Sequence, residues 1–152
     1  MTRSARRRAL GLGALSTLAM GVLWAPAFEH AQATGYGDWQ WFHHMWETGR
    51  TAIVRWGEPP LFDPHHCGGV PLWGNPQAQV YSPTWAVTGL LFGTTLGHKL
   101  YLLLHAIAGH AGMYLLGRRF LGLSQVGSFL TATFWAASGF FVDLTTRDHT
   151  AG

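Results

Sequence analysis

Three long stretches without a charged residue constrain this chain more than any other feature. They cover residues 9–28, 100–117 and 120–142. Because a helix needs about 20 mainly apolar residues to cross a bilayer, these stretches predict an all-α, polytopic membrane protein with spans at about 9–28, 98–117 and 120–142. Charged residues make up 11% of the chain, against about 25% in soluble domains. An ordinary water-soluble globule is therefore not expected.

A fourth uncharged stretch, residues 64–98, is interrupted by prolines at Pro64, Pro71, Pro76 and Pro83. Only its last part, residues 84–97, can be helical, and that segment is too short for a comfortable span. We expect a re-entrant or interfacial helix there.

Basic residues set the predicted orientation. Arginines precede the first stretch, and Arg118 and Arg119 separate the second from the third. Short basic loops stay in the cytoplasm, so the N-terminus is expected inside, the loop 29–97 outside and the turn 118–123 inside a bacterial inner membrane. An alternative treats the first stretch as a signal peptide cleaved near Ala33. Both alternatives place the following loop outside the cytoplasm.

Composition excludes several classes of protein. The single cysteine excludes an internal disulfide framework and a cysteine-rich zinc site. The basic residues form no stripe that would bind nucleic acid. The chain stops shortly after the third predicted span, so we expect the N-terminal piece of a longer membrane protein, of undetermined oligomeric state.

The external loop begins with a helical pattern. Asp38 is a suitable N-cap for the segment DWQWFHHMWETGRTAIVRW. Trp39, Phe42, Trp46 and Ile53 recur at helical spacing and predict one apolar face that lies on the bilayer surface. At about 100° per residue, Asp38 and Glu47 fall on opposite faces. They therefore do not form a carboxylate pair within this helix.

After this helix, glycine and proline are dense enough to predict a structured loop rather than a helix or strand. Its small, directional polar side chains can line a binding cleft, and the candidates for substrate contact are Asp63, Asn75, Gln77 and Tyr81. Asp63 also lies close in sequence to His65, His66 and Cys67. These residue types bind zinc or copper, but their spacing matches no standard site.

The order of motifs in this region resembles that of a known family. A Gly-Asp and a Trp-rich helix are followed by Gly-x-Pro-Pro-Leu-Phe-Asp-Pro, Cys-Gly-Gly-x-Pro, Asn-Pro-Gln, Tyr-Ser-Pro and an Arg-Arg-Phe-Leu-Gly-Leu-Ser turn. This resembles the start of bacterial GT-C glycosyltransferases, especially the YfhO-like group, over residues ~9–149. The chain departs from that pattern at Phe62-Asp63-Pro64, where Trp-Asn-Pro is usual, and at Trp73-Gly74-Asn75, where Leu-Ala-Asn is usual.

The resemblance implies transfer of a sugar from a polyprenyl-phosphate donor to an acceptor outside the cytoplasm, with membrane lipid as a further partner. The resemblance places Asp38 where the family carries a catalytic or metal-organising carboxylate, and we expect Asp38 to be the general base. Asp148 lies near the place of a second acidic motif; we expect Asp148 and His149 to face a divalent metal, Mg²⁺ or Mn²⁺, or the phosphate, and Arg147 to meet the lipid phosphate.

Each of these residues has a simpler interpretation. Asp38 can cap a helix without reacting, and Asp148 and His149 can be ordinary loop residues. His43 and His44 can lie on an interfacial helix without a ligand. For the whole chain, the alternatives are a non-catalytic membrane subunit or export component, and a histidine-rich binder of metal or haem.

The same choice applies to polar and aromatic residues near the membrane. His98, His105 and His110 lie in or near the second predicted span, where polar side chains are functional candidates, although neutral histidines also pack inside helix bundles. Gly109 and Gly112 predict close helix contact. The many tryptophans predict either an interfacial belt or platforms on which sugar rings stack.

Overall fold

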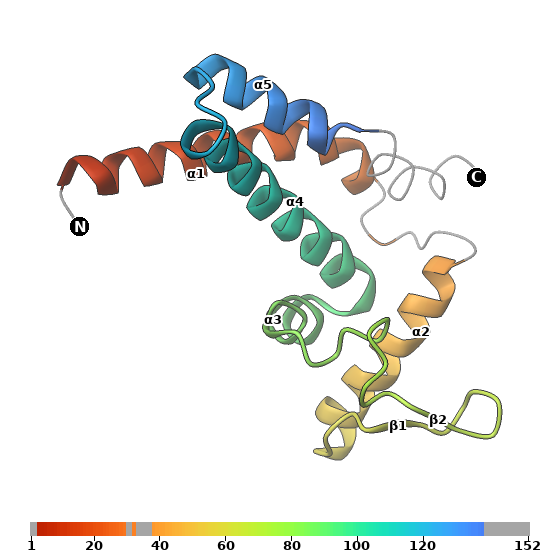
Figure 1. Ribbon diagram of the computed structural model, residues 1–152. Helices are drawn as coiled ribbons and strands as arrows, with labels where there is room; N and C mark the ends of the chain where they lie inside the picture. Colours follow the sequence, from red (N-terminus) through yellow and green to blue (C-terminus); the bar gives the residue numbers. More distant parts are fainter. Residues whose placement is uncertain (1–2, 30–31, 33–37, 139–152) are drawn as a thin grey trace. The chain divides into compact units, whose positions relative to one another are not determined.

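The computed structural model describes residues 3–29, 32 and 38–138, and these are mainly helical (Figure 1). The α-helices are α1 (Arg3–Trp24), α2 (Asp38–Thr51), α3 (Pro83–Phe92), α4 (Thr94–Arg119) and α5 (Gln125–Ala136). A 3-10 turn, Ala25–Phe28, follows α1, and a π-helical turn, Ala52–Trp56, follows α2. Two short strands, β1 (Phe62–Asp63) and β2 (Val70–Pro71), complete the order. The predominantly helical part of the predicted fold class is confirmed.

The chain forms two compact units, each described here by itself. The helical unit contains α1, its 3-10 turn, α4 from Leu102 onward, and α5. The loop unit contains α2, the two strands, α3 and the first turns of α4 up to Tyr101.

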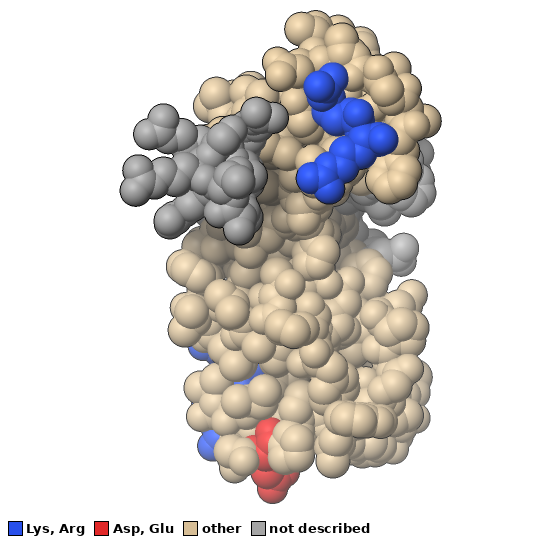
Figure 2. Space-filling view, turned by 60° about the vertical axis from the view of Figure 1, so that its left-hand side comes forward, with Lys and Arg blue, Asp and Glu red and all other residues tan. Residues whose placement is uncertain are grey.

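Helix α4 contains the whole predicted span 98–117. Within the described residues it alone is both long and apolar enough to cross a membrane. Only 11% of its apolar window is buried against protein, whereas the central helix of a soluble protein is mostly covered. Shorter apolar helices occur at Ala14–Phe28 and Pro83–Phe92. The predicted number of three spans stays a prediction. The face drawn in Figure 2 carries few charged atoms, as the composition requires.

In the helical unit, small and polar residues form the contacts between the helices. His110 on α4 is fully buried; its Nδ1 lies 3.1 Å from Ser16 Oγ on α1, and its Nε2 lies 3.2 Å from Thr133 Oγ1 on α5. A Cβ built at Gly109 would lie 2.8 Å from the Trp135 ring, whereas one at Gly112 would meet no described residue within 4 Å. The predicted close helix contact is therefore confirmed at Gly109, and the described part of the chain shows none at Gly112.

The third predicted span does not begin as a helix. Residues after Arg119 turn back through Gly122, which has a positive φ of 65°. The Arg118 guanidinium donates to the Leu123 carbonyl, and the Ser124 hydroxyl caps α5 by accepting from Gly127 N at 3.0 Å. The prediction of one continuous segment from 120 is thus wrong in its first residues, and residues 139–142 lie outside the described part.

The loop unit has its own apolar core. Met45 and Trp46 of α2 are fully buried against Leu72, Ala78, Val80 and Trp85. Phe42 and Ile53 pack on the same cluster. The predicted apolar face of α2 therefore exists, but the loop that follows α2 folds back and covers much of it, so that Trp46 is fully buried and Phe42 and Ile53 are partly buried. The expectation that this face lies on the bilayer surface is corrected for Trp46, which has no exposed area left for lipid.

The secondary structure of this unit differs from the prediction in two places. The segment predicted as purely irregular contains an antiparallel pair of strands, in which Phe62 faces Pro71 and Asp63 faces Val70. The turn between them passes through Gly68 and Gly69, both with positive φ. Glycine adopts this conformation without the steric cost of a Cβ, so the chain can reverse direction there.

The segment predicted as one helix over 84–97 is two helices. Gly93, with φ 78° and ψ −178°, ends α3, and α4 begins at Thr94. The two helices touch closely, because a Cβ built at Gly97 would lie 2.5 Å from the Thr88 carbonyl oxygen. Gly97 thus permits backbone contact between α3 and α4.

Candidate functional site

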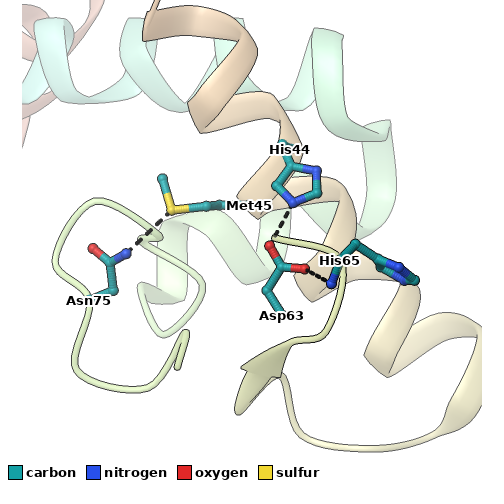
Figure 3. A network of polar contacts seen from close by, with 5 residues as sticks. All are labelled: His44, Met45, Asp63, His65 and Asn75. Carbon is teal, nitrogen blue, oxygen red and sulfur yellow. Dashed lines mark hydrogen bonds and ion pairs between the residues drawn. The ribbon is translucent and has the colours of Figure 1, made fainter. Parts of the chain in front are cut away.

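The loop unit contains a buried carboxylate, Asp63, whose two oxygens both have hydrogen-bond partners. Its side chain is fully buried. Oδ2 lies 2.6 Å from His44 Nε2, and Oδ1 accepts a hydrogen bond from the His65 backbone N–H at 2.9 Å (Figure 3). A buried carboxylate is costly unless it is paired and hydrogen-bonded, and here each oxygen has a partner.

Two elements bring this pair together. His44 lies on α2, and Asp63 is the inward-facing residue of β1, where Phe62 faces outward. The backbone then turns so that the N–H of His65 caps the Asp63 carboxylate, as Asp side chains often do in turns. The antiparallel contact of β1 with β2 holds this turn against α2.

His44 differs from Asp63 in being partly open to solvent. Its side chain is 35% exposed. Its hydrogen bond to Asp63 is made through Nε2. When Nε2–H donates to Asp63, Nδ1 carries the lone pair and can accept a proton. A carboxylate that fixes one nitrogen of an imidazole and leaves the other available is the arrangement used in general-base catalysis.

Aromatic rings border this pair. Trp41 stacks on His44 with centroids 6.0 Å apart and an interplanar angle of 23°. His66 lies 4.3 Å from the Trp41 ring and 6.0 Å from the His44 ring. Cys67, which is exposed and has a positive φ of 49°, follows at the tip of the hairpin. The pair therefore lies beside a small patch of rings rather than in open solvent.

The predicted substrate-loop residues do not all have the same surroundings. Asn75 is used by the fold: its Oδ1 accepts from Gln77 N at 3.0 Å, and its Nδ2 contacts Met45 Sδ at 3.5 Å (Figure 3). The Gln77 side chain is exposed. Tyr81 donates its hydroxyl to the Pro60 carbonyl at 2.6 Å, and desolvation raises the pKa of that hydroxyl. Asp63 alone joins the His44 pair.

The residues to which the resemblance assigns the chemistry lie wholly or partly outside the described residues. Helix α2 does begin at Asp38, as predicted, but the Asp38 side chain lies outside what the structure describes. Arg147, Asp148 and His149 also lie outside the described residues. Their predicted roles stay predictions.

The divalent metal expected from the resemblance involves Asp148 and His149, which lie outside the described residues, so that expectation stays a prediction. Within residues 3–29, 32 and 38–138, no group of three or more His, Cys, Asp or Glu residues is arranged to hold a metal ion. Asp63, His65, His66 and Cys67 therefore do not form the cluster that their sequence order suggests.

A second histidine, His43, has the opposite environment to His44. It is buried, with its ring 5.4 Å from that of His98 and 6.1 Å from that of Trp39. Burial lowers the pKa of His43 below its usual 6.5, and the nearby Lys99 ammonium lowers it further. His43 is therefore a packed, neutral residue rather than a proton acceptor at the surface.

Sequence reasoning missed two residues. The sequence indicates His44 only as part of a His-His pair on a surface helix, whereas its partner Asp63 is 19 residues away. Gln79 was passed over, although it has a positive φ of 56° and a buried amide oxygen without a hydrogen-bond partner among the described residues. No local sequence pattern predicts the His44–Asp63 contact or the buried Gln79 oxygen, because each depends on how the loop folds back on α2.

Comparison of the chain with protein-family models, curated proteins and solved structures finds no match in any of the three.

Proposed function

We propose that this chain is the N-terminal part of a membrane glycosyltransferase of the GT-C type. It transfers a sugar from a polyprenyl-phosphate donor to a hydroxyl acceptor at the outer face of a bacterial inner membrane. The observation that carries the proposal is the buried Asp63 carboxylate bonded to the partly exposed His44. The resemblance of the loop motifs supplies the reaction class.

The membrane setting has separate support. Helix α4 is long and apolar enough to span a bilayer, and its apolar residues are largely uncovered by protein. The loop unit immediately precedes this helix in the chain. A catalytic group in that unit therefore lies within a short stretch of sequence from a lipid-embedded helix, as a lipid-linked donor requires.

In the proposed reaction, His44 acts as the general base and Asp63 supports it. The acceptor hydroxyl loses its proton to His44 Nδ1 while its oxygen forms a bond to the anomeric carbon. The bond from that carbon to the phosphate oxygen breaks, and the phosphate leaves with the electron pair. Asp63 stabilises the imidazolium that results and keeps the ring oriented. General-base catalysis of this kind contributes about 10²–10⁴-fold.

Asp38 remains the base that the resemblance implies, and a comparison of variants separates the two assignments. Membranes containing the protein are given a polyprenyl-phosphate hexose labelled in the sugar, and movement of the label out of the lipid fraction is measured. The variants are His44→Gln, Asp63→Asn and Asp38→Asn. His65→Gln is the matched control, because His65 is exposed and bonds Asp63 only through its backbone.

We expect His44→Gln to lower transfer by about 10²-fold or more, and Asp63→Asn to lower it while the His65→Gln control keeps the parent rate. Full transfer by His44→Gln together with its loss in Asp38→Asn would move the base to Asp38. Absence of transfer in the parent protein, despite normal membrane insertion, would reject the enzyme and favour a non-catalytic subunit.

A further inference from the structure

A small hollow lies in the loop unit away from the His44 pair. It has a volume of about 240 Å³ and is lined by Gly74, Asn75, Pro76, Gln79, Tyr81 and Ser82. Pockets for drug-sized ligands measure about 300–1,000 Å³, so this one suits a single small ring. Its wall contains no Lys, Arg, His, Asp or Glu, which favours an uncharged ligand.

The rim supplies an aromatic surface. Trp73, next to the hollow in sequence, has 64% of its surface exposed. Its ring meets that of Tyr81, which lines the hollow, edge-on, with centroids 4.4 Å apart and an interplanar angle of 71°. The bond from the Tyr81 hydroxyl to Pro60 fixes that ring. An exposed tryptophan held edge-on in this way keeps a ring face available to the apolar side of a ligand.

Gln79 supplies the polar feature. Its amide oxygen is buried without a partner among the described residues, and its backbone adopts a positive φ that only glycine tolerates easily. Buried acceptors are nearly always hydrogen-bonded, and backbone strain of this kind gathers at binding sites. The Asn75 amide, by contrast, is already engaged by the fold. Gln79 is therefore the amide in the wall that a ligand hydroxyl can satisfy once its side chain turns into the hollow.

We propose that this hollow binds one neutral sugar ring, whose C–H face lies on the Trp73 ring with Tyr81 at its edge, and whose hydroxyl group donates to Gln79. The choice of a sugar among neutral polar rings rests on the proposed glycosyl transfer, which this inference deepens by placing a saccharide subsite on the Asn-Pro-Gln to Tyr-Ser-Pro segment. Such a ring combines an apolar face with several hydroxyl donors, as the two sides of the hollow require.

The test measures binding without turnover. The full chain, purified in lipid nanodiscs, is titrated with the methyl glycosides of glucose, galactose, mannose and N-acetylglucosamine, and saturation transfer from protein to sugar protons is recorded by NMR. We expect saturable transfer, strongest at the C–H protons of one ring face, for at least one of these sugars.

Variants locate the contact. Trp73→Ala should weaken the Kd by about tenfold or more, since it removes the apolar platform. Gln79→Ala should weaken it by about 2- to 10-fold through loss of one hydrogen bond. Gln79→Gly relieves the backbone strain and serves as a second variant in case Gln79→Ala folds poorly. Trp56→Ala is the matched control, because Trp56 is likewise exposed but lies outside the hollow.

Unchanged binding in Trp73→Ala, or no saturable binding of any of these sugars, would overturn the inference. Because no donor is present, the result is independent of the transfer assay. Sugar binding without any transfer would reject the proposed enzyme and leave the subsite. Transfer that is insensitive to Trp73→Ala, with no sugar binding, would reject the subsite alone.

Discussion

His110 and Ser16, 94 residues apart in the chain, lie side by side in the helical unit with Nδ1 3.1 Å from Oγ. The Thr133 hydroxyl lies 3.2 Å from Nε2, the other ring nitrogen, and donates its own hydrogen to the Phe129 carbonyl oxygen at 2.9 Å. Nε2 must therefore donate to Thr133, which leaves Nδ1 to accept from Ser16. One neutral imidazole thus satisfies groups on α1, α4 and α5.

Removal of that imidazole should loosen the helical unit. Interhelical hydrogen bonds in membranes contribute about 0.6 kcal/mol on average and up to about 1.7 kcal/mol, so His110→Leu should lower the free energy of unfolding within about that range. A double-mutant cycle with Ser16→Ala, measured by unfolding in mixed micelles, isolates the contact. A coupling energy of zero between His110 and Ser16 would contradict the contact.

Gly49 should tolerate no side chain, because a Cβ there would lie 2.6 Å from Val80 Cγ1. Overpacking of a filled core costs about 1–3 kcal/mol, which exceeds the gain of up to about 1 kcal/mol from replacing a helical glycine by alanine. Gly49→Ala should therefore lower the thermal midpoint. Gly21→Ala, where nothing lies within 4 Å, should not. In the Gly49→Ala/Val80→Ala double variant, the penalty of the two changes should be less than additive.

The stability of the loop unit should fall as the pH drops below about 6.5. The pKa of His43 is lowered in the fold, first by burial and then by Lys99, from the 6.5 of an unhindered histidine. Between the lowered value and 6.5 the unfolded chain binds more protons, so acid favours unfolding. The stability that His43 contributes is therefore present above 6.5 and lost as the pH falls through the folded pKa.

Thermal unfolding between about pH 7.5 and pH 5 measures this dependence. His43→Gln should make the curve less steep in that range, because it removes one titrating group. His65→Gln should leave it steep, since His65 is exposed. A steep curve in His43→Gln would assign the acid sensitivity to another group.

Labelling of the native cysteine, Cys67, tests the predicted orientation of the chain in the membrane. Cys67 is exposed in the loop unit, which the basic residues predict to lie outside the cytoplasm. A maleimide that cannot cross membranes should therefore label it in intact spheroplasts, and Cys67→Ser should abolish the signal. With Cys67→Ser as background, Leu121→Cys in the predicted cytoplasmic turn should be labelled only after lysis. The reverse pattern would invert the topology, and external labelling of both would argue against a span in α4.

The periodicity of Trp39, Phe42 and Trp46 was sufficient to predict α2 and its apolar face, because those depend on neighbouring residues. It could not predict what covers that face. The covering residues, from Leu72 to Trp85, come from a segment whose own pattern is irregular. Local spacing specifies that a surface must be buried, whereas the partner is chosen by the whole fold.

The candidate site follows the same division. The sequence directed attention to Asp63 through its motif, and to His44 only as one of a pair of histidines. Their contact depends on the strand pair and on the turn at Gly68 and Gly69, none of which has a period to detect. Gly93 was overlooked for a related reason: one glycine in an apolar stretch is a weak signal, although its positive φ divides α3 from α4.

The contact of Gly97 with the Thr88 carbonyl has a mechanical consequence. At this contact the backbone of α3 touches the backbone of α4, with no side chain between them that could change rotamer. We therefore expect α3 and the first turns of α4 to move as one rigid body. Trp85 on α3 packs edge-on against Trp46, and His98 stacks on the same ring at 4.5 Å. Within the loop unit, a displacement of this helix pair would therefore carry Trp85 and His98 together and shift the Trp46 ring of α2 with them.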